Sequence, residues 1–260
     1  MESVEELRRL LQEPRRHVDT WYGKHVMRRF SIYLTRFFIE RKWSPNQVTL
    51  LSLAAALVAA FLMSLSHFFL GIAFLNLWYL LDHVDGEVAR YTKQSSPTGF
   101  YFDTVVNFIA QPCFFYGFGL GLTKDGGGIF YALAAVSAFS ALLLMVLPLC
   151  EDAIVLSLSQ KAGILPPAPH ASTGEEPKPG FAKQCFMIWH ESILFPNFLL
   201  VLTAAAFFLL FMPARVFGIL SILFVYDTLS CTGIWILQLA QKVRSKKLDA
   251  AFNENKPANV

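Results

Sequence analysis

The chain has 260 residues, of which 55% are hydrophobic and 25 are Phe. Soluble domains have about 45–50% apolar residues, so this composition excludes an ordinary soluble domain and predicts one membrane domain. The formal net charge of +3 says little, whereas the distribution of Lys and Arg along the chain is informative.

Residues 1–43 are charged throughout, and we expect no signal peptide because they lack an early apolar segment. Residues 1–19 predict a loose surface helix, and residues 21–38 predict an amphipathic one. The apolar stripe of this second helix consists of Tyr22, Val26, Phe30, Tyr33 and Phe37, and the basic residues off it are Lys24, Arg28 and Arg29. Such a helix lies in the membrane interface and favours anionic lipid. The alternative is a helix packed on the body of the protein.

A helix start follows, with Ser44 as N-cap, Pro45 at the first helical position and Gln47 completing a capping box. The apolar runs then predict six transmembrane helices. They cover residues 48–66, 69–90, 98–122, 129–157, 192–212 and 216–240. The fold class is therefore an all-α integral membrane protein, with six transmembrane helices preceded by an amphipathic interfacial helix.

The predicted organisation has three parts. They are an N-terminal segment at 1–43, a transmembrane catalytic domain at 44–243 with a loop at about 158–191, and a polar tail at 244–260. Within the third span, Gly117 and Gly121 have the G-x3-G spacing that lets helices approach closely. We expect packing within the chain rather than a dimer interface there.

The basic residues predict the orientation in the membrane. With six spans, 20 of the 22 Lys and Arg fall on the side of the two termini, and only Lys124 and Arg215 fall opposite. The positive-inside rule then predicts a multi-pass protein of the cell membrane with both termini cytoplasmic.

Acidic residues stand out inside apolar segments, where a carboxylate is costly and marks a functional site. Asp82 and Asp85 share one helix face with Gly86 and Ala89, and Arg90 lies at its edge. On the next helix Gly99, Asp103 and Asn107 also share a face. Two helices that present carboxylates to each other, with small residues between, predict a site for a divalent metal and a bulky ligand.

These residues resemble the CDP-alcohol phosphotransferase (CDP-alcohol phosphatidyltransferase) family, whose pattern is D-x2-D-G-x2-A-R-x8-G-x3-D-x3-D. The matching residues are Asp82, Asp85, Gly86, Ala89, Arg90, Gly99 and Asp103. The departure is Asn107, which stands where the family has its last aspartate, the presumed general base.

The resemblance implies a membrane enzyme of phospholipid biosynthesis. It would transfer a substituted phosphate from a CDP-linked lipid or alcohol to an acceptor hydroxyl and release CMP. Hard divalent ions suit this chemistry, and Asp82, Asp85 and Asp103 are expected to bind Mg²⁺ or Mn²⁺, as two ions per site. Asp103 and position 107 are the implied catalytic positions. The partners implied are the donor, an acceptor alcohol, membrane lipid and a second copy of the chain, with no nucleic acid.

The remaining motif residues receive expected roles. Gly86 and Ala89 should leave room for the nucleotide, and Gly99 should allow close approach of the third span. Arg90 should contact a phosphate or act as an interfacial anchor.

An amide at position 107 cannot accept a proton at useful pH, which leaves three explanations open. The change inactivates or impairs the enzyme; another group supplies the base, such as His83 or a metal-bound water; or the protein binds a CDP-lipid without turnover. A transporter that uses the intramembrane acids is a further alternative.

Other residues carry weaker expectations. Glu87 is expected to meet solvent. Asp227 is expected to be functional or a hydrogen-bonded structural residue, and Trp189-His190-Glu191 an interfacial anchor or part of the acceptor pocket. The cysteines lack metal-binding spacing and are expected to be small apolar fillers. They are Cys113, Cys150, Cys185 and Cys231.

Overall fold

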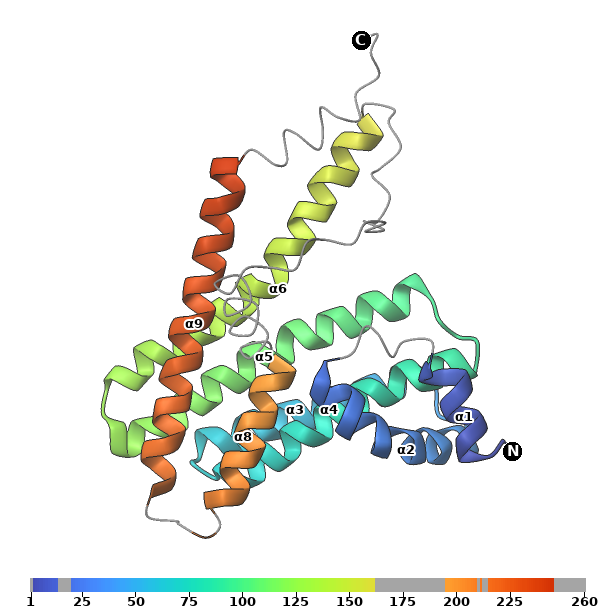
Figure 1. The fold of residues 1–260 in the computed structure, drawn as a ribbon, viewed down its shortest axis with the longest axis horizontal. Coiled ribbons are helices and arrows are strands. Elements are labelled where there is room, and N and C mark those ends of the chain that lie inside the picture. The colour runs from blue at the N-terminus through green and yellow to red at the C-terminus, as the bar shows by residue number, and fades with distance from the viewer. Residues whose placement is uncertain (1, 14–19, 162–194, 210, 212–214, 246–260) are drawn as a thin grey trace, which may run out of the picture.

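The computed structural model is helical, without strands in the part of the chain that it describes, namely residues 2–13, 20–161, 195–209, 211 and 215–245. The helices are α1 (Val4–Leu11), the π-helical turn η2 (Gly23–Met27), α2 (Arg28–Glu40), α3 (Pro45–Ser64), α4 (Phe68–Tyr91), α5 (Pro97–Gly126), α6 (Ile129–Lys161), α8 (Phe195–Leu209) and α9 (Val216–Ser245). Figure 1 shows α9 beside α6 at one side of the molecule and α1 and α2 beside α4 at the other.

The predicted membrane architecture is confirmed. Among the described helices, α3, α4, α5, α6 and α9 are long and apolar enough to cross a membrane. The span predicted at 192–212 corresponds to α8, an apolar helix with 15 described residues; residues 192–194, 210 and 212 lie outside the described part. Three helices run several residues past their predicted C-terminal ends: α5 continues to Gly126, α6 to Lys161 and α9 to Ser245. Most of the predicted loop, from residue 162, and the tail from residue 246 lie outside the described residues.

The start of α3 has the predicted capping box. The Gln47 backbone N–H donates to Ser44 Oγ (3.4 Å), and the Ser44 N–H donates to Gln47 Oε1 (2.9 Å). These bonds satisfy two amide groups at the helix N-terminus. They also fix the first turns of α3, which carry polar side chains beside α4.

Glycines bring α3 and α5 into close contact. A Cβ on Gly117 would lie 2.3 Å from the Ala60 carbonyl oxygen, and one on Gly121 would lie 2.0 Å from that of Met63. Both distances are far below van der Waals contact, so only glycine permits this approach. The expectation of packing within the chain is therefore confirmed.

The first two helices form a layer on α4. The predicted loose helix at 1–19 is α1, which is docked rather than loose, because Leu7 and Leu11 are buried against Ile32 of α2. The predicted amphipathic helix is confirmed as the continuous helix formed by η2 and α2. Of its apolar stripe, Phe30, Tyr33 and Phe37 are exposed.

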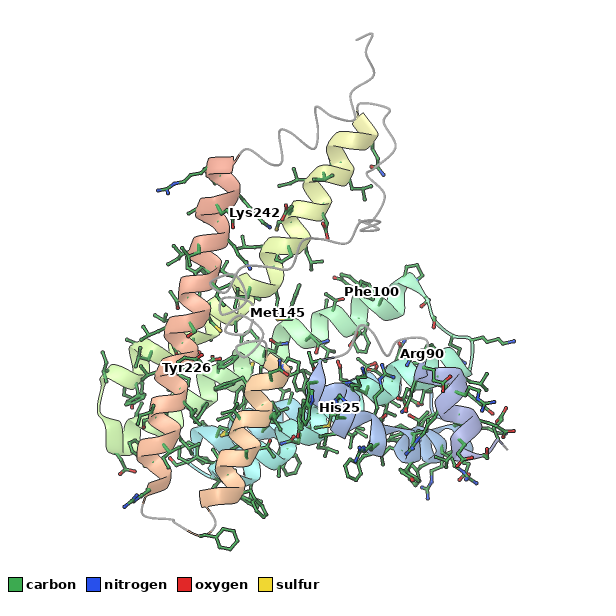
Figure 2. All side chains as sticks on the ribbon, in the orientation of Figure 1. His25, Arg90, Phe100, Met145, Tyr226 and Lys242 are labelled. Carbon is green, nitrogen blue, oxygen red and sulfur yellow. The ribbon has the colours of Figure 1, made fainter. Side chains whose placement is uncertain are left out.

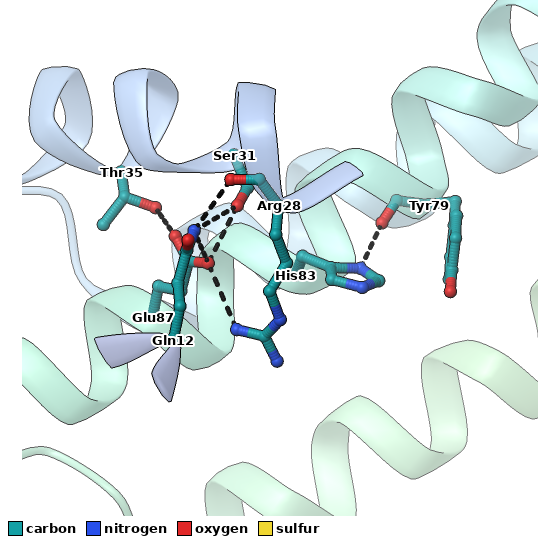
Figure 3. Close-up of polar contacts among 7 residues, drawn as sticks. All are labelled: Gln12, Arg28, Ser31, Thr35, Tyr79, His83 and Glu87. Atoms are coloured by element: carbon teal, nitrogen blue, oxygen red, sulfur yellow. Dashed lines mark hydrogen bonds and ion pairs between the residues drawn. The ribbon is translucent and has the colours of Figure 1, made fainter. Parts of the chain in front are cut away.

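The buried face of α2 includes polar residues, and these surround a carboxylate of α4 (Figure 3). Glu87 is completely buried, which corrects the expectation that it meets solvent. Its Oε1 accepts hydrogen bonds from Ser31 Oγ (2.8 Å) and Gln12 Nε2 (2.9 Å), and its Oε2 accepts one from Thr35 Oγ1 (2.6 Å). Arg28 forms an ion pair with it at 3.5 Å. The face of α4 opposite Asp82 therefore meets the N-terminal layer, and the expectation failed because helical angles do not reveal what covers a face.

A second polar chain joins this layer to α8. Burial raises the pKa of the Tyr22 hydroxyl, so the group stays protonated. It donates to Asn76 Oδ1 of α4 (2.5 Å), and Asn76 Nδ2 donates to Thr203 Oγ1 of α8 (2.9 Å). The helix that carries the motif is thus held from both sides.

We predict that Glu87→Ala releases the N-terminal layer. The change leaves Arg28 and the hydroxyl and amide donors around it buried without their acceptor, and breaking a buried charged pair costs about 3–5 kcal/mol. Limited trypsin digestion of the purified protein should then cut within α2 much faster than in the unmodified chain. The matched control is Glu40→Ala, which removes an exposed pair with Arg36 and should change stability by less than about 1 kcal/mol. Equal digestion of all three proteins would contradict the prediction.

Candidate active site

The acidic residues of α4 and α5 meet, as the sequence predicts. Asn107 of α5 lies between the two helices, and its Nδ2 donates to Asp82 Oδ1 (3.2 Å) and to Asp103 Oδ1 (3.3 Å). The amide presents its hydrogens here because its carbonyl oxygen would repel the two carboxylates. Position 107 is therefore in direct contact with two of the three predicted metal ligands.

The third predicted ligand, Asp85, lies one turn from Asp82 on the same face of α4. It is buried, and Thr49 Oγ1 of α3 donates to its Oδ2 (2.8 Å). Asp85 and Asp103 both line a pocket of about 200 Å³ between the ends of α3, α4 and α5. Three helices thus supply side chains to one site.

The other four motif residues line this same pocket, namely Gly86, Ala89, Arg90 and Gly99. At Gly86 a Cβ would meet only the guanidinium of Arg90, at 3.2 Å or more, so this face of α4 is open towards the pocket. Arg90 is labelled in Figure 2, where it lies at the side of the molecule that carries the N-terminal helices.

One expectation about the glycines is wrong. A Cβ on Gly99 would meet Ser96 Oγ at 3.3 Å and Asn46 Oδ1 at 3.9 Å, and no backbone within 4 Å. The close approach of α5 to α3 occurs instead at Gly117 and Gly121. Gly99 lies in the first turn of α5, where its N–H donates to Oγ of the N-cap residue Ser96 (3.0 Å). It lines the pocket and, having no side chain, leaves space there.

The donor set has the chemistry of a hard-cation site. Carboxylate and hydroxyl oxygens from Asp82, Asp85, Asp103 and Thr49 are the ligand types that Mg²⁺ and Mn²⁺ prefer. Within the described residues, no three Asp, Glu, His or Cys side chains are gathered as in a formed metal cluster. The Asn107 amide instead links Asp82 and Asp103 by hydrogen bonds.

The other candidates lie apart from the pocket. His83 Nδ1 is hydrogen-bonded to the Tyr79 carbonyl (2.9 Å; Figure 3), and its ring is packed against Gly23 of η2. Asp227 is buried in α9, where Cys231 Sγ donates to its Oδ2 (3.7 Å). Residues 189–191 lie outside the described part of the chain.

The contribution of α3 to the pocket was missed by the sequence reasoning. Thr49 and Asn46 were assigned only to the first turns of a membrane helix, yet both line the pocket. A signal was present, because polar residues gather in the part of α3 that lies level with the acids of α4. Sequence alone did not show that α3 is the helix beside them.

Comparison with known proteins finds a family similarity for part of the chain. Residues 42–161 match the model of the CDP-alcohol phosphatidyltransferase family. The chain is 33% identical over 119 residues to a phosphatidylinositol phosphate synthase of Streptomyces avermitilis, which covers 45% of this chain and 48% of the relative. It is 35% identical over 99 residues to a bifunctional IPC transferase and DIPP synthase of Rubrobacter xylanophilus. This match covers 38% of this chain and 23% of the relative.

The matches thus span about half, or less, of the curated relatives' length. Among solved structures, one similar chain is phosphatidylinositol phosphate synthase of Mycobacterium tuberculosis with CDP-DAG bound. That likeness has a TM-score of 0.45 and 16% identity, and covers 79% of this chain and 91% of the other.

The matched range includes every motif position from Asp82 to Asn107 and the three helices whose ends form the pocket. This match covers slightly less than half of the chain. Residues 42–161 are therefore similar to the CDP-alcohol phosphatidyltransferase family.

Proposed function

We propose that the protein transfers a substituted phosphate from a CDP-linked lipid or alcohol to an acceptor hydroxyl, releasing CMP. One observation carries the proposal. Most motif residues of α4 and α5 line a single pocket, with one carboxylate from each helix and an arginine beside an open glycine face. The remaining two, Asp82 and Asn107, lie next to the pocket residue Asp103 through the hydrogen bonds of Asn107. This arrangement suits a pyrophosphate and a nucleoside next to divalent cations.

Each residue of the site would have a separate role in binding the metal ions and the donor. Asp82, Asp85 and Asp103 would hold Mg²⁺ or Mn²⁺, two ions per site, and the bound ions would neutralise the pyrophosphate charge. Arg90 would bind a phosphate oxygen, and Gly86 and Ala89 would leave room for the nucleotide. Thr49, which donates to Asp85, would orient that carboxylate.

The transfer itself makes one bond and breaks one. The acceptor oxygen loses its proton and bonds to the phosphorus that carries the donor's alcohol. The bond from that phosphorus to the CMP oxygen breaks, and CMP takes the electron pair. Since positioning and charge stabilisation dominate such reactions, the site can bind and orient both substrates even when proton transfer is poorly assisted.

Asn107 weakens the proton-transfer step. An amide has no basic group, and a positioned general base contributes about 10²–10⁴-fold in rate. With an ion bound, Asn107 would offer its carbonyl oxygen as a neutral metal ligand.

The second candidate is a protein that binds a CDP-lipid without turnover. The contacts of Asn107 favour it, because the amide bridges both carboxylates and removes the basic oxygen from the position nearest to them. His83 is the alternative base on α4, although it packs against η2. A homodimer and a functional role for Asp227 stay predictions.

We expect metal-dependent CDP binding to require the carboxylates. Asp82→Ala or Asp103→Ala removes an oxygen ligand, and we expect Mg²⁺-dependent affinity for CDP to fall by at least about tenfold, as for other metal-site changes. Calorimetric titration of the purified protein with CDP, with and without Mg²⁺, measures it. The matched control is Asp125→Ala, which removes an exposed carboxylate from α5, the helix that carries Asp103. Unchanged affinity in both site variants would show that the metal assignment is wrong.

We expect Asn107→Asp to raise transferase activity by about 10²-fold or more, because it restores a base next to Asp82 and Asp103. The assay is CMP release from a CDP-lipid with a panel of acceptor alcohols at matched membrane levels. Asn107→Ala, which removes the amide without adding a base, should show no such gain. Equal, substantial activity in the unmodified and Asn107→Asp proteins would move the base to another group, with His83 tested next.

We propose a cell-membrane location with the pocket on the cytoplasmic side, supported by the Lys and Arg asymmetry. In a variant without native cysteines, a membrane-impermeant thiol reagent added outside sealed cells should label Lys124→Cys and not Lys93→Cys. Permeabilised cells provide the control for reactivity at both positions. Labelling of position 93 in sealed cells would reverse the orientation.

A further inference from the structure

A second cavity, of about 310 Å³, lies in the N-terminal layer and shares no lining residue with the motif pocket. Four of its lining residues are cationic, namely Arg8, Lys24, Arg28 and Arg29, and one, Glu13, is acidic. His25 and Gln12 complete the lining. Clustered cations repel one another, so this surface favours a ligand with more than one negative charge.

The local backbone explains how so many basic residues reach one cavity. In η2 the Arg28 N–H donates to the Gly23 carbonyl, five residues back, as in a π-helical turn. In a regular α-helix Lys24 and Arg29 would point about 140° apart, whereas the wider turn brings residues five apart onto neighbouring positions. Single π turns of this kind occur frequently at functional sites.

The inner wall of the cavity is held in place before any ligand binds. Gln12 Nε2 donates to the Arg28 carbonyl (2.9 Å) and to Glu87 Oε1 (2.9 Å), and Arg28 pairs with the same carboxylate. Arg8 donates from its Nη2 to the Arg29 carbonyl (3.4 Å). Its Nε is buried and has no hydrogen-bond partner among the described residues, so this wall has a donor to offer.

The surroundings of the cavity indicate where its ligand comes from. Trp21 is 59% exposed and stacks on His25 at 4.9 Å between ring centroids, while Tyr33 is 58% exposed and lies under the Arg8 guanidinium at 5.9 Å. Trp and Tyr favour the headgroup level of a membrane, and Lys and Arg there attract anionic lipids. Aromatic and basic side chains are thus interleaved at the cavity's edge.

We propose that this cavity binds the phosphate group of an anionic membrane phospholipid. Arginine guanidinium groups match phosphate oxygens with paired hydrogen bonds, and the exposed aromatic side chains would lie among the neighbouring lipids. Inorganic phosphate offers the same chemistry without the lipid. The membrane source is favoured because the cavity lies beside exposed aromatic residues of a chain with membrane-spanning helices. The site is separate from catalysis, and it does not depend on the proposed reaction.

The test uses the full chain purified in an uncharged detergent. Binding of a fluorescent short-chain phosphatidic acid is followed by anisotropy, with three unlabelled competitors: short-chain phosphatidic acid, short-chain phosphatidylcholine and inorganic phosphate. We expect the phosphatidic acid to compete, and the other two to compete at least tenfold more weakly. Inorganic phosphate that competes as well as the lipid would overturn the assignment to lipid, and so would equal competition by the zwitterionic lipid.

Paired variants locate the site. Lys24→Gln with Arg29→Gln removes two cavity charges and leaves the Arg28–Glu87 pair intact, and we expect affinity to fall at least tenfold. Arg36→Gln with Arg41→Gln removes two charges from the same helix outside the cavity and should leave affinity within about twofold. Equal losses in the two double variants would show a general effect of surface charge and overturn the proposal.

A third variant tests the sign of the effect. Glu13→Gln removes the acidic residue of the lining, and affinity should rise several-fold; a fall would contradict the proposal. Size-exclusion profiles verify that each variant is folded. Should the first double variant aggregate, Arg29→Gln alone, an exposed side chain, replaces it, and unchanged affinity in that variant would count against the site.

Discussion

Buried carboxylates on α4 determine how the other helices pack around it. An uncompensated charge in an apolar setting is costly, and each acid of this helix is stabilised by hydrogen-bond donors from a different helix or layer. Glu87 faces the N-terminal layer, where hydroxyl, amide and guanidinium donors satisfy it. Asp82 and Asp85 face the opposite way and meet donors from α5 and α3. The helix is therefore fixed in rotation, and the pocket residues are held on the correct side.

The same packing explains why the pocket lies at one end of the helices. Further along, glycines bring α5 into contact with the backbone of α3 and leave no space between them. At the motif end, Gly86 and Gly99 have only flexible or distant atoms opposite their missing Cβ positions. Glycine thus serves two purposes in these three helices: it permits contact in the membrane core and keeps space for a ligand at the rim.

The two cavities lie on opposite faces of α4, and side chains of α4 contact residues that line the N-terminal cavity. Gln12 and Arg28 line the basic cavity and also contact Glu87, which follows Gly86 directly in the chain. The motif pocket contains carboxylates and so suits cations, whereas the N-terminal cavity suits anions. This charge separation keeps the acidic ligand set away from the cationic surface, because the thickness of α4 lies between them.

Sequence by itself determined the membrane helices, the capping box of α3 and the shared faces of Asp82 with Asp85 and of Asp103 with Asn107, because hydrophobic runs and helical angles are local properties. It also indicated the resemblance to the CDP-alcohol phosphotransferase family, because the motif has fixed spacing. Only the tertiary structure decided what each face meets. Glu87, Thr49 and the basic cavity depend on contacts between helices far apart in the chain, and no local pattern specifies which helix covers a polar face. Gly99 and Gly121 look alike in sequence; their different roles follow from whether a backbone lies opposite.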